Sequence, residues 1–264
     1  MANKYPTTPK STVQIRQKGQ IRMRNIFVFF DLGGTLVDLR GIVASMAARL
    51  SAIRVRGPVP LALRWAMTTA EALPVAQGPR FRSEREIASD VLFDLLAKRS
   101  RTDARDSSVR LVREAWSGYV GSCSLQPDIT IAWLRVLQSK VSGLAVVTDG
   151  DTDAVADVLS HTGLTEIFDT VTTSEAVRSY KPDPGIYRAA MKALKARPSE
   201  SLFVSDAALD LQGAASLGIA AAWIRRNLLP DLAKPPSGTL VLPRIQDVDR
   251  IVTSFAKTGR FALG

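Results

Sequence analysis

Residues 26–38 read IFVFFDLGGTLVD, and this stretch decides the fold. Its first five residues, Ile26–Phe30, are all apolar and of β-forming types, which is typical of a parallel strand buried on both faces. The strand ends at Asp31, and the glycine turn Gly33–Gly34 follows. Because open α/β sheets bind their ligands at the carboxyl ends of their strands, Asp31 is a candidate functional residue.

The same arrangement, an apolar run followed by polar residues, occurs twice more. Leu144–Val147 precedes Thr148–Asp149–Gly150, and Leu202–Val204 precedes Ser205–Asp206. The remaining candidate elements are the strands Ala220–Ile224 and Thr239–Leu242 and the helices Ile129–Ser139, Thr152–Ser160, Pro184–Lys195 and Leu209–Leu217. Such alternation of strands and helices predicts an α/β fold with a doubly wound, Rossmann-like parallel sheet.

One segment, residues 40–120, breaks this alternation. Its apolar residues recur at helical spacing, for example over residues 86–96 and 109–116, and four prolines divide it into several helices. An all-helical block after the first strand is best interpreted as a small second domain. The predicted parts are a basic, disordered tail at residues 1–24, a core domain at residues 25–38 and 122–264, and a helical domain at residues 39–121.

Composition excludes several classes of protein. The chain has 264 residues, 46% of them hydrophobic, which is enough for a substantial core. Cys123 is the only cysteine and His161 the only histidine, so a disulfide framework and metal sites built on several cysteines or histidines are excluded. No apolar run approaches the roughly 18 residues of a membrane span. We expect a soluble, cytoplasmic monomer or homodimer with no membrane partner.

The net charge of +10 is regional. Residues 1–24 carry six basic and no acidic side chains, residues 39–121 carry 14 basic and 8 acidic ones, and the remainder has a net charge of −2. We interpret the tail as a solvated arm. Binding of nucleic acid or anionic lipid, a transit peptide and a translation start at Met23 are the alternatives. We expect no nucleic-acid partner.

The predicted strand ends carry residues with a direct chemical use. A carboxylate such as Asp31 can attack phosphorus or carbon and form a covalent intermediate. Carboxylate oxygens also hold Mg²⁺, which neutralises the charge of a phosphate. The other residues at these ends are Thr148, Asp206 and Asp210, with Lys181 in a loop between them.

Four motifs, in this order, resemble those of the haloacid dehalogenase superfamily. They are Phe29–Asp38, Val146–Gly150, Tyr180–Tyr187, and Phe203–Asp206 with Asp210, Gly213 and Ala214. The likeness covers about residues 26–250, and the helical block stands where that superfamily has its cap domain. The resemblance implies a hydrolase that acts through an aspartyl intermediate. We expect a small anionic, phosphorylated substrate.

The resemblance also implies roles for individual residues. Asp31 would be the nucleophile, Thr148 would orient the anionic group of the substrate, and Lys181 would anchor it. Mg²⁺ would be held by Asp31, Asp206 and the backbone carbonyl of Gly33. The remaining candidates are Asp149 and Gly150 for substrate binding, and Asp210 and Ser205 as additional site residues.

Gly33 departs from the phosphatase pattern. Phosphatases of this superfamily have a second aspartate at that position, which serves as general acid and base. Such groups contribute about 10²- to 10⁴-fold to the rate, so its loss should weaken phosphatase turnover. The metal need not be affected, because glycine retains the backbone carbonyl.

Other features resemble the 2-haloacid dehalogenase branch. Residues 203–210 align with its fourth motif without gaps, and Lys181 and Tyr187 match its spacing. That branch, however, has a tyrosine at the position of Gly33 and asparagines at the positions of Asp149 and Ala207. Asp206 would also place negative charge beside a carboxylate substrate.

Three functional hypotheses remain open. The first is a Mg²⁺-dependent hydrolase. The net charge of +6 of the helical domain would suit its anionic substrate, and Arg40, Arg49 and Arg54 are the arginines that could face the site. The second is a metal-free, dehalogenase-like hydrolase. The third is a catalytically degenerate member that serves as a binding module. The residues interpreted as structural are Tyr187, His161, Cys123 and the four tryptophans at 65, 116, 133 and 223.

Overall fold

The computed structural model describes residues 24–97, 104–226 and 233–263. Within them, a six-stranded sheet has the order β3-β2-β1-β4-β5-β6, and all its pairings are parallel. The strands are β1 (Phe27–Phe30), β2 (Gly143–Thr148), β3 (Thr170–Thr173), β4 (Ser201–Ser205), β5 (Ala220–Ile224) and β6 (Leu240–Leu242). The predicted doubly wound α/β fold is therefore confirmed.

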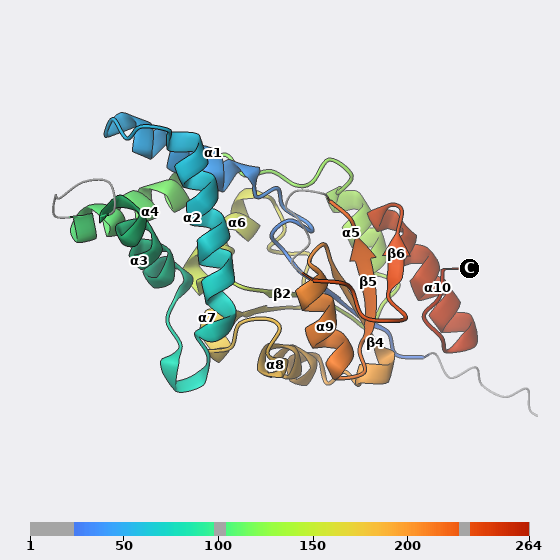
Figure 1. Ribbon diagram of the computed structural model, residues 1–264. Coiled ribbons are helices and arrows are strands. Elements are labelled where there is room, and N and C mark those ends of the chain that lie inside the picture. The colour runs from blue at the N-terminus through green and yellow to red at the C-terminus, as the bar shows by residue number, and fades with distance from the viewer. Residues whose placement is uncertain (1–23, 98–103, 227–232, 264) are drawn as a thin grey trace, which may run out of the picture.

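Helices cover both faces of the sheet (Figure 1). Phe27 and Phe29 pack with α8 (Pro184–Leu194) and α9 (Ala208–Ser216) on one face. Val28 and Phe30 pack on the other face with α5 (Ile131–Gln138), α6 (Thr152–His161) and α10 (Val248–Thr258). Because both faces are buried, β1 is a continuous apolar run rather than an alternating one. A single turn of helix, α7 (Ser174–Val177), follows β3.

The cap consists of four helices inserted between β1 and α5, as the sequence predicts. They are α1 (Arg40–Ala52), α2 (Pro58–Ala72), α3 (Glu84–Ala97) and α4 (Ala104–Val120), and they gather at one side of the sheet (Figure 1). Two short 3₁₀ turns, Leu73–Val75 and Gly78–Arg80, separate α2 from α3. The cap has its own core, in which the rings of Trp65 and Trp116 pack edge to face with their centroids 5.6 Å apart.

Some elements differ from the sequence prediction. Strand β3 was not expected, because three of its four residues are threonines and it lies at the edge of the sheet. Helix α10 was also not assigned, although its buried residues Val248, Ile251, Val252 and Phe255 follow the helical period. The other predicted core helices and strands are in place, with ends displaced by at most two residues.

Several structural interpretations can be compared with the observed burial. Cys123 is buried and His161, the last residue of α6, is exposed. Of the four tryptophans, Trp65 is fully buried, and Trp116, Trp133 and Trp223 are partly buried and pack against the core clusters, in agreement with the prediction. In the part of the chain that the structure describes, no helix is long and apolar enough to cross a bilayer. The predicted basic tail, apart from Arg24, and the alternative start at Met23 lie outside the described residues.

Candidate active site

The candidate site lies at the carboxyl ends of β1, β2 and β4. The register of the sheet places Phe30 beside Val146 on one side and Val204 on the other. Asp31 follows β1 directly, and its backbone N–H donates to the carbonyl of Val204 at 3.0 Å. The acidic residue after β1 is thereby held between the loops that follow the two neighbouring strands.

Lys181 joins two buried carboxylates. Its Nζ lies 2.5 Å from Oδ1 of Asp31 and 2.7 Å from Oδ2 of Asp210, and all three side chains are less than 10% exposed. Burial acts to lower the pKa of Lys181, but the charges of Asp210 and Asp31 outweigh it and hold that pKa well above its usual value. Burial raises the pKa of Asp31, while Lys181 opposes the rise. The single positive charge of the ammonium is thus shared between two buried carboxylates.

Neighbouring residues fix the Lys181–Asp210 pair. Ser205, the last residue of β4, donates its hydroxyl to Oδ2 of Asp210 at 2.9 Å. Tyr187 on α8 donates its hydroxyl to the Asp210 carbonyl at 2.8 Å. A Cβ at Gly213 would lie 2.6 Å from that tyrosine oxygen, so glycine is needed for this close approach. Tyr187 packs in the core as expected, and its hydroxyl also positions a site residue.

Thr35 links Asp31 to Asp206. Its Oγ1 lies 2.9 Å from Oδ2 of Asp31 and 3.1 Å from Oδ1 of Asp206, and it accepts a hydrogen bond from the Asp206 backbone N–H at 2.9 Å. One hydroxyl hydrogen therefore serves two carboxylates. Burial and the charge of Asp31 raise the pKa of Asp206 to about 7. Sequence reasoning missed Thr35, although it stands within the decisive stretch.

Two of the proposed magnesium ligands, Asp31 and Asp206, lie close together in this arrangement. Their oxygens share one neutral hydroxyl, and the single positive charge of Lys181 is shared between Asp31 and Asp210, so a cation between Asp31 and Asp206 is chemically suited to the site. Asp210 turns toward Lys181 and Ser205 instead. Among the described residues, no group of three or more Asp, Glu, His or Cys side chains could hold a metal. Mg²⁺ would accordingly rely on two carboxylates, water and the Gly33 carbonyl.

The loop after β2 borders the site but is tied to other protein groups. The hydroxyl of Thr148 donates to the carbonyl of Asp149 at 3.0 Å, and the N–H of Gly150 donates to Ser174 at 2.9 Å. Asp149 accepts from the backbone N–H of Lys181 at 3.0 Å, and burial raises its pKa to about 7. These three residues line the cavity beside Asp31. Their contacts with an anionic group remain a prediction.

A cavity of about 600 Å³ separates the cap from the core above these residues. Its core side includes Asp31, Lys181 and Asp206. Of the three cap arginines that the sequence offers, Arg40 does line the cavity, but the expected excess of positive charge is not found among the described residues of this wall. Among the described cap residues lining the cavity, Arg40 is the only cation, and its exposed guanidinium pairs with Asp38. Neither Arg49 nor Arg54 lines it.

The cap instead contributes a carboxyl group, Glu84, at the start of α3. Asp151 fixes this helix end by accepting from the backbone N–H groups of Glu84 and Arg85 at 2.8 and 3.2 Å, and from Nε of Arg85 at 2.6 Å. Burial and the nearby charge of Asp151 raise the pKa of Glu84 to about 8. No sequence pattern marked Glu84, because its position depends on how the cap meets the loop after β2.

Glu84→Gln is expected to flatten the dependence of stability on pH. The folded protein keeps the Glu84 proton up to about pH 8, whereas the unfolded chain loses it near the ordinary value of 4.5. The unfolded state therefore binds fewer protons in this range, and Glu84 makes the free energy of unfolding fall as pH rises. Glutamine removes this loss and should stabilise the protein by about 1–3 kcal/mol at pH 8.

Urea unfolding at pH 5 and pH 8 measures this effect. Glu71→Gln is the matched control, because Glu71 also lines the cavity but is exposed. The same pH slope in wild type and Glu84→Gln would contradict the prediction.

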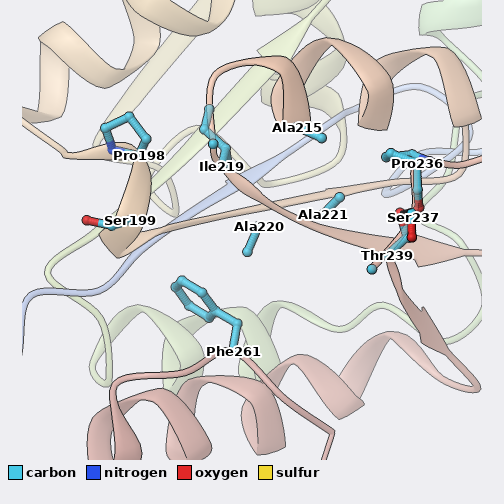
Figure 2. A pocket seen from close by; sticks show the side chains of 12 residues that line it. Pro198, Ser199, Ala215, Ile219, Ala220, Ala221, Pro236, Ser237, Thr239 and Phe261 are labelled. Atoms are coloured by element: carbon cyan, nitrogen blue, oxygen red, sulfur yellow. Dashed lines mark hydrogen bonds between the residues drawn. The ribbon is translucent and has the colours of Figure 1, made fainter.

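A second hollow, of about 260 Å³, lies away from these residues (Figure 2). It borders the amino-terminal ends of β4 and β5, opposite to the edge that carries Asp31, with Pro198 and Phe261 among its lining residues. None of its lining side chains is titratable. Of these two cavities, the one between cap and core is therefore the one with titratable side chains in its lining.

Comparison with known proteins places the chain in a family. Residues 27–218 match the model of the haloacid dehalogenase-like hydrolases, and the chain belongs to that family. It is similar to the crystal structure of an L-2-haloacid dehalogenase, with a TM-score of 0.66 and 26% identity, over 86% of this chain and 98% of that one. The predicted family and the insertion of a helical cap after the first strand are confirmed.

Curated relatives match a shorter region. The (S)-2-haloacid dehalogenase of Pseudomonas sp. strain YL is 35% identical over 105 residues, which are 39% of this chain and 45% of that protein. The phosphoserine phosphatase of Thermus thermophilus is 34% identical over 101 residues, which are 38% of this chain and 41% of that protein. The matched regions thus span less than half the length of these two relatives.

Proposed function

We propose that this chain is a hydrolase of the 2-haloacid dehalogenase type, which forms a covalent ester on Asp31 without a metal. The ion pairs of Lys181 with Asp31 and Asp210 carry this proposal, because a cation of the protein itself holds both the nucleophile and the carboxylate beside it. Haloacid dehalogenases among the relatives support it. Gly33 speaks against the phosphatase, because it leaves the phosphatase acid–base position empty, although it also differs from the tyrosine of the dehalogenase branch.

The reaction has two steps on this geometry. A carboxylate oxygen of Asp31 attacks the carbon that bears the halogen, the carbon–halogen bond breaks, and the halide leaves with the electron pair. Water then loses a proton to Asp210 and attacks the Asp31 carbonyl carbon. Collapse of this adduct breaks the ester bond, and the departing alkoxide takes the proton from Asp210. The products are a hydroxy acid, halide and, after Asp31 ionises, a proton.

Particular contacts suit these residues to their roles. Lys181 and Ser205 both bind Oδ2 of Asp210, so Oδ1 can accept the proton from water. Thr35 and Lys181 each bind one oxygen of Asp31, which orients the nucleophile before attack. These contacts support the proposed roles of Asp31 as the nucleophile, Asp210 as the base and Lys181 as the anchor of the reacting groups.

The test is halide release from 2-chloropropanoate, with and without EDTA, using Asp31→Asn as the blank. We expect release that EDTA leaves unchanged and that the variant lacks. A single turnover with excess enzyme in ¹⁸O-water should give unlabelled product, because the new oxygen comes from Asp31. EDTA-sensitive release or labelled first-turnover product would reject the proposal.

Mg²⁺-dependent hydrolysis of a phosphate ester is the second candidate. The observation that favours it is the pair Asp31–Asp206 on the hydroxyl of Thr35. Bound Mg²⁺ would neutralise the charge of a phosphoryl group there. Asp206→Asn separates the candidates: it should abolish a Mg²⁺-dependent phosphatase and leave metal-free halide release measurable. If neither haloacids nor phosphate esters were turned over but anions still bound, the degenerate binding module would be favoured.

A further inference from the structure

The cavity between cap and core is larger than a two- or three-carbon acid requires. Its volume of about 600 Å³ falls within the 300–1,000 Å³ typical of sites that enclose drug-sized ligands. It is continuous with the catalytic edge, because Asp31 and Lys181 are among its lining residues. A substrate that reacts at Asp31 therefore has room for a further group.

The cap wall of this cavity is apolar. Helix α1 contributes Ile42 and Val43, α2 contributes Leu63 and Met67, and α4 contributes Trp116. Leu63 and Met67 are 42% and 39% exposed, although both line the cavity. Apolar side chains that remain exposed on one concave wall are typical of a binding surface.

The positions of the charged side chains around the cavity indicate how an anionic substrate would be oriented in it. The cap wall carries two carboxyl side chains, Glu71 and Glu84, and a single arginine that is paired with Asp38. The buried cation at Asp31 is Lys181, on the core side. The other lining cations, Lys181, Arg225 and Arg226, lie on the core side together with the acidic residues of the site. An anionic head would therefore find its cationic partners there, and whatever is attached to it would extend toward the cap.

We propose that the substrate carries a medium-chain alkyl or aryl body, held by the apolar cap wall, behind an anionic head at the core side. This inference rests on the proposed function for the identity of the bond that is broken. The binding of the alkyl or aryl body by the cap wall does not depend on that function. Removal of the body from water is the source of affinity, at about 0.8 kcal/mol for each methylene. That energy corresponds to a factor of about four for each methylene.

The kinetic test compares 2-chloropropanoate, 2-chlorohexanoate and 2-chlorooctanoate. We expect kcat/KM to rise about fourfold for each added methylene until the cavity is filled. Ala66→Phe on α2 adds bulk to the lining and should reduce kcat/KM for 2-chlorooctanoate at least tenfold while changing that for 2-chloropropanoate little. Arg64→Phe is the control, because Arg64 lies on the same helix, is exposed and does not line the cavity.

A binding measurement separates this inference from the proposed function. Calorimetric titration uses unreactive butanoate, hexanoate and octanoate, and alkylphosphonates of the same lengths, on the full chain. Affinity that grows with chain length in wild type, and loses that growth in Ala66→Phe, supports the inference even if no halide is released. Affinity independent of chain length with both heads, or equal effects of Ala66→Phe and Arg64→Phe, would overturn it.

Discussion

Lys181→Met should reduce turnover by about 10²- to 10³-fold, because it removes the charged donor that binds the nucleophile. It should also lower the free energy of unfolding by about 3–5 kcal/mol, since Asp31 and Asp210 are left buried without their shared counter-charge. Halide release and urea unfolding measure the two effects. Stability close to that of the wild type would contradict this account of the site.

Lys140→Met is the matched control for stability. Lys140 also forms a short ion pair, at 2.6 Å with Asp249, but its side chain is 43% exposed. Water screens such a pair, so its removal should cost no more than about 1 kcal/mol.

The double variant Lys181→Met with Asp210→Asn separates stability from catalysis. The second change removes one uncompensated charge and should restore part of the lost stability, but not the activity. Recovery of both would contradict the catalytic roles of Lys181 and of Asp210.

Much of the architecture is predictable because local signals agree with the global fold. The continuous apolar runs that end at Asp31, Thr148 and Ser205 belong to parallel strands covered on both faces, so their carboxyl ends meet at one edge. Lys181 could be assigned to the same place only through the resemblance of its loop, because no periodicity positions a loop lysine.

The contacts within the site were less predictable. The bond between Thr35 and Asp206 joins residues 171 positions apart and depends on the register of β1 against β4. The charge of the cap wall was mispredicted for a related reason. A net charge counts every side chain of a segment, whereas a substrate meets only the wall, where the one cation among the described cap residues, Arg40, is paired with Asp38.

Gly33→Asp should increase Mg²⁺-dependent hydrolysis of p-nitrophenyl phosphate by about 10²-fold, because it supplies an acid–base group beside Asp31. The backbone of Gly33 lies outside the left-handed region, so it accepts a side chain without strain. A Cβ there would lie 3.0 Å from Cδ2 of Leu39, and the end of that flexible, 40%-exposed side chain can move aside.

Gly33→Asn distinguishes chemistry from shape in this experiment. Asparagine has nearly the same size as aspartate but cannot exchange a proton with the leaving group, so it should give no gain. Halide release should fall in the aspartate variant, because a further negative charge beside Asp31 repels an anionic haloacid. Equal phosphatase rates for the two variants would mean that acid–base catalysis at position 33 does not limit phosphate hydrolysis. The opposite responses of the two activities to one carboxylate would link the choice of reaction to the residue two positions after the nucleophile.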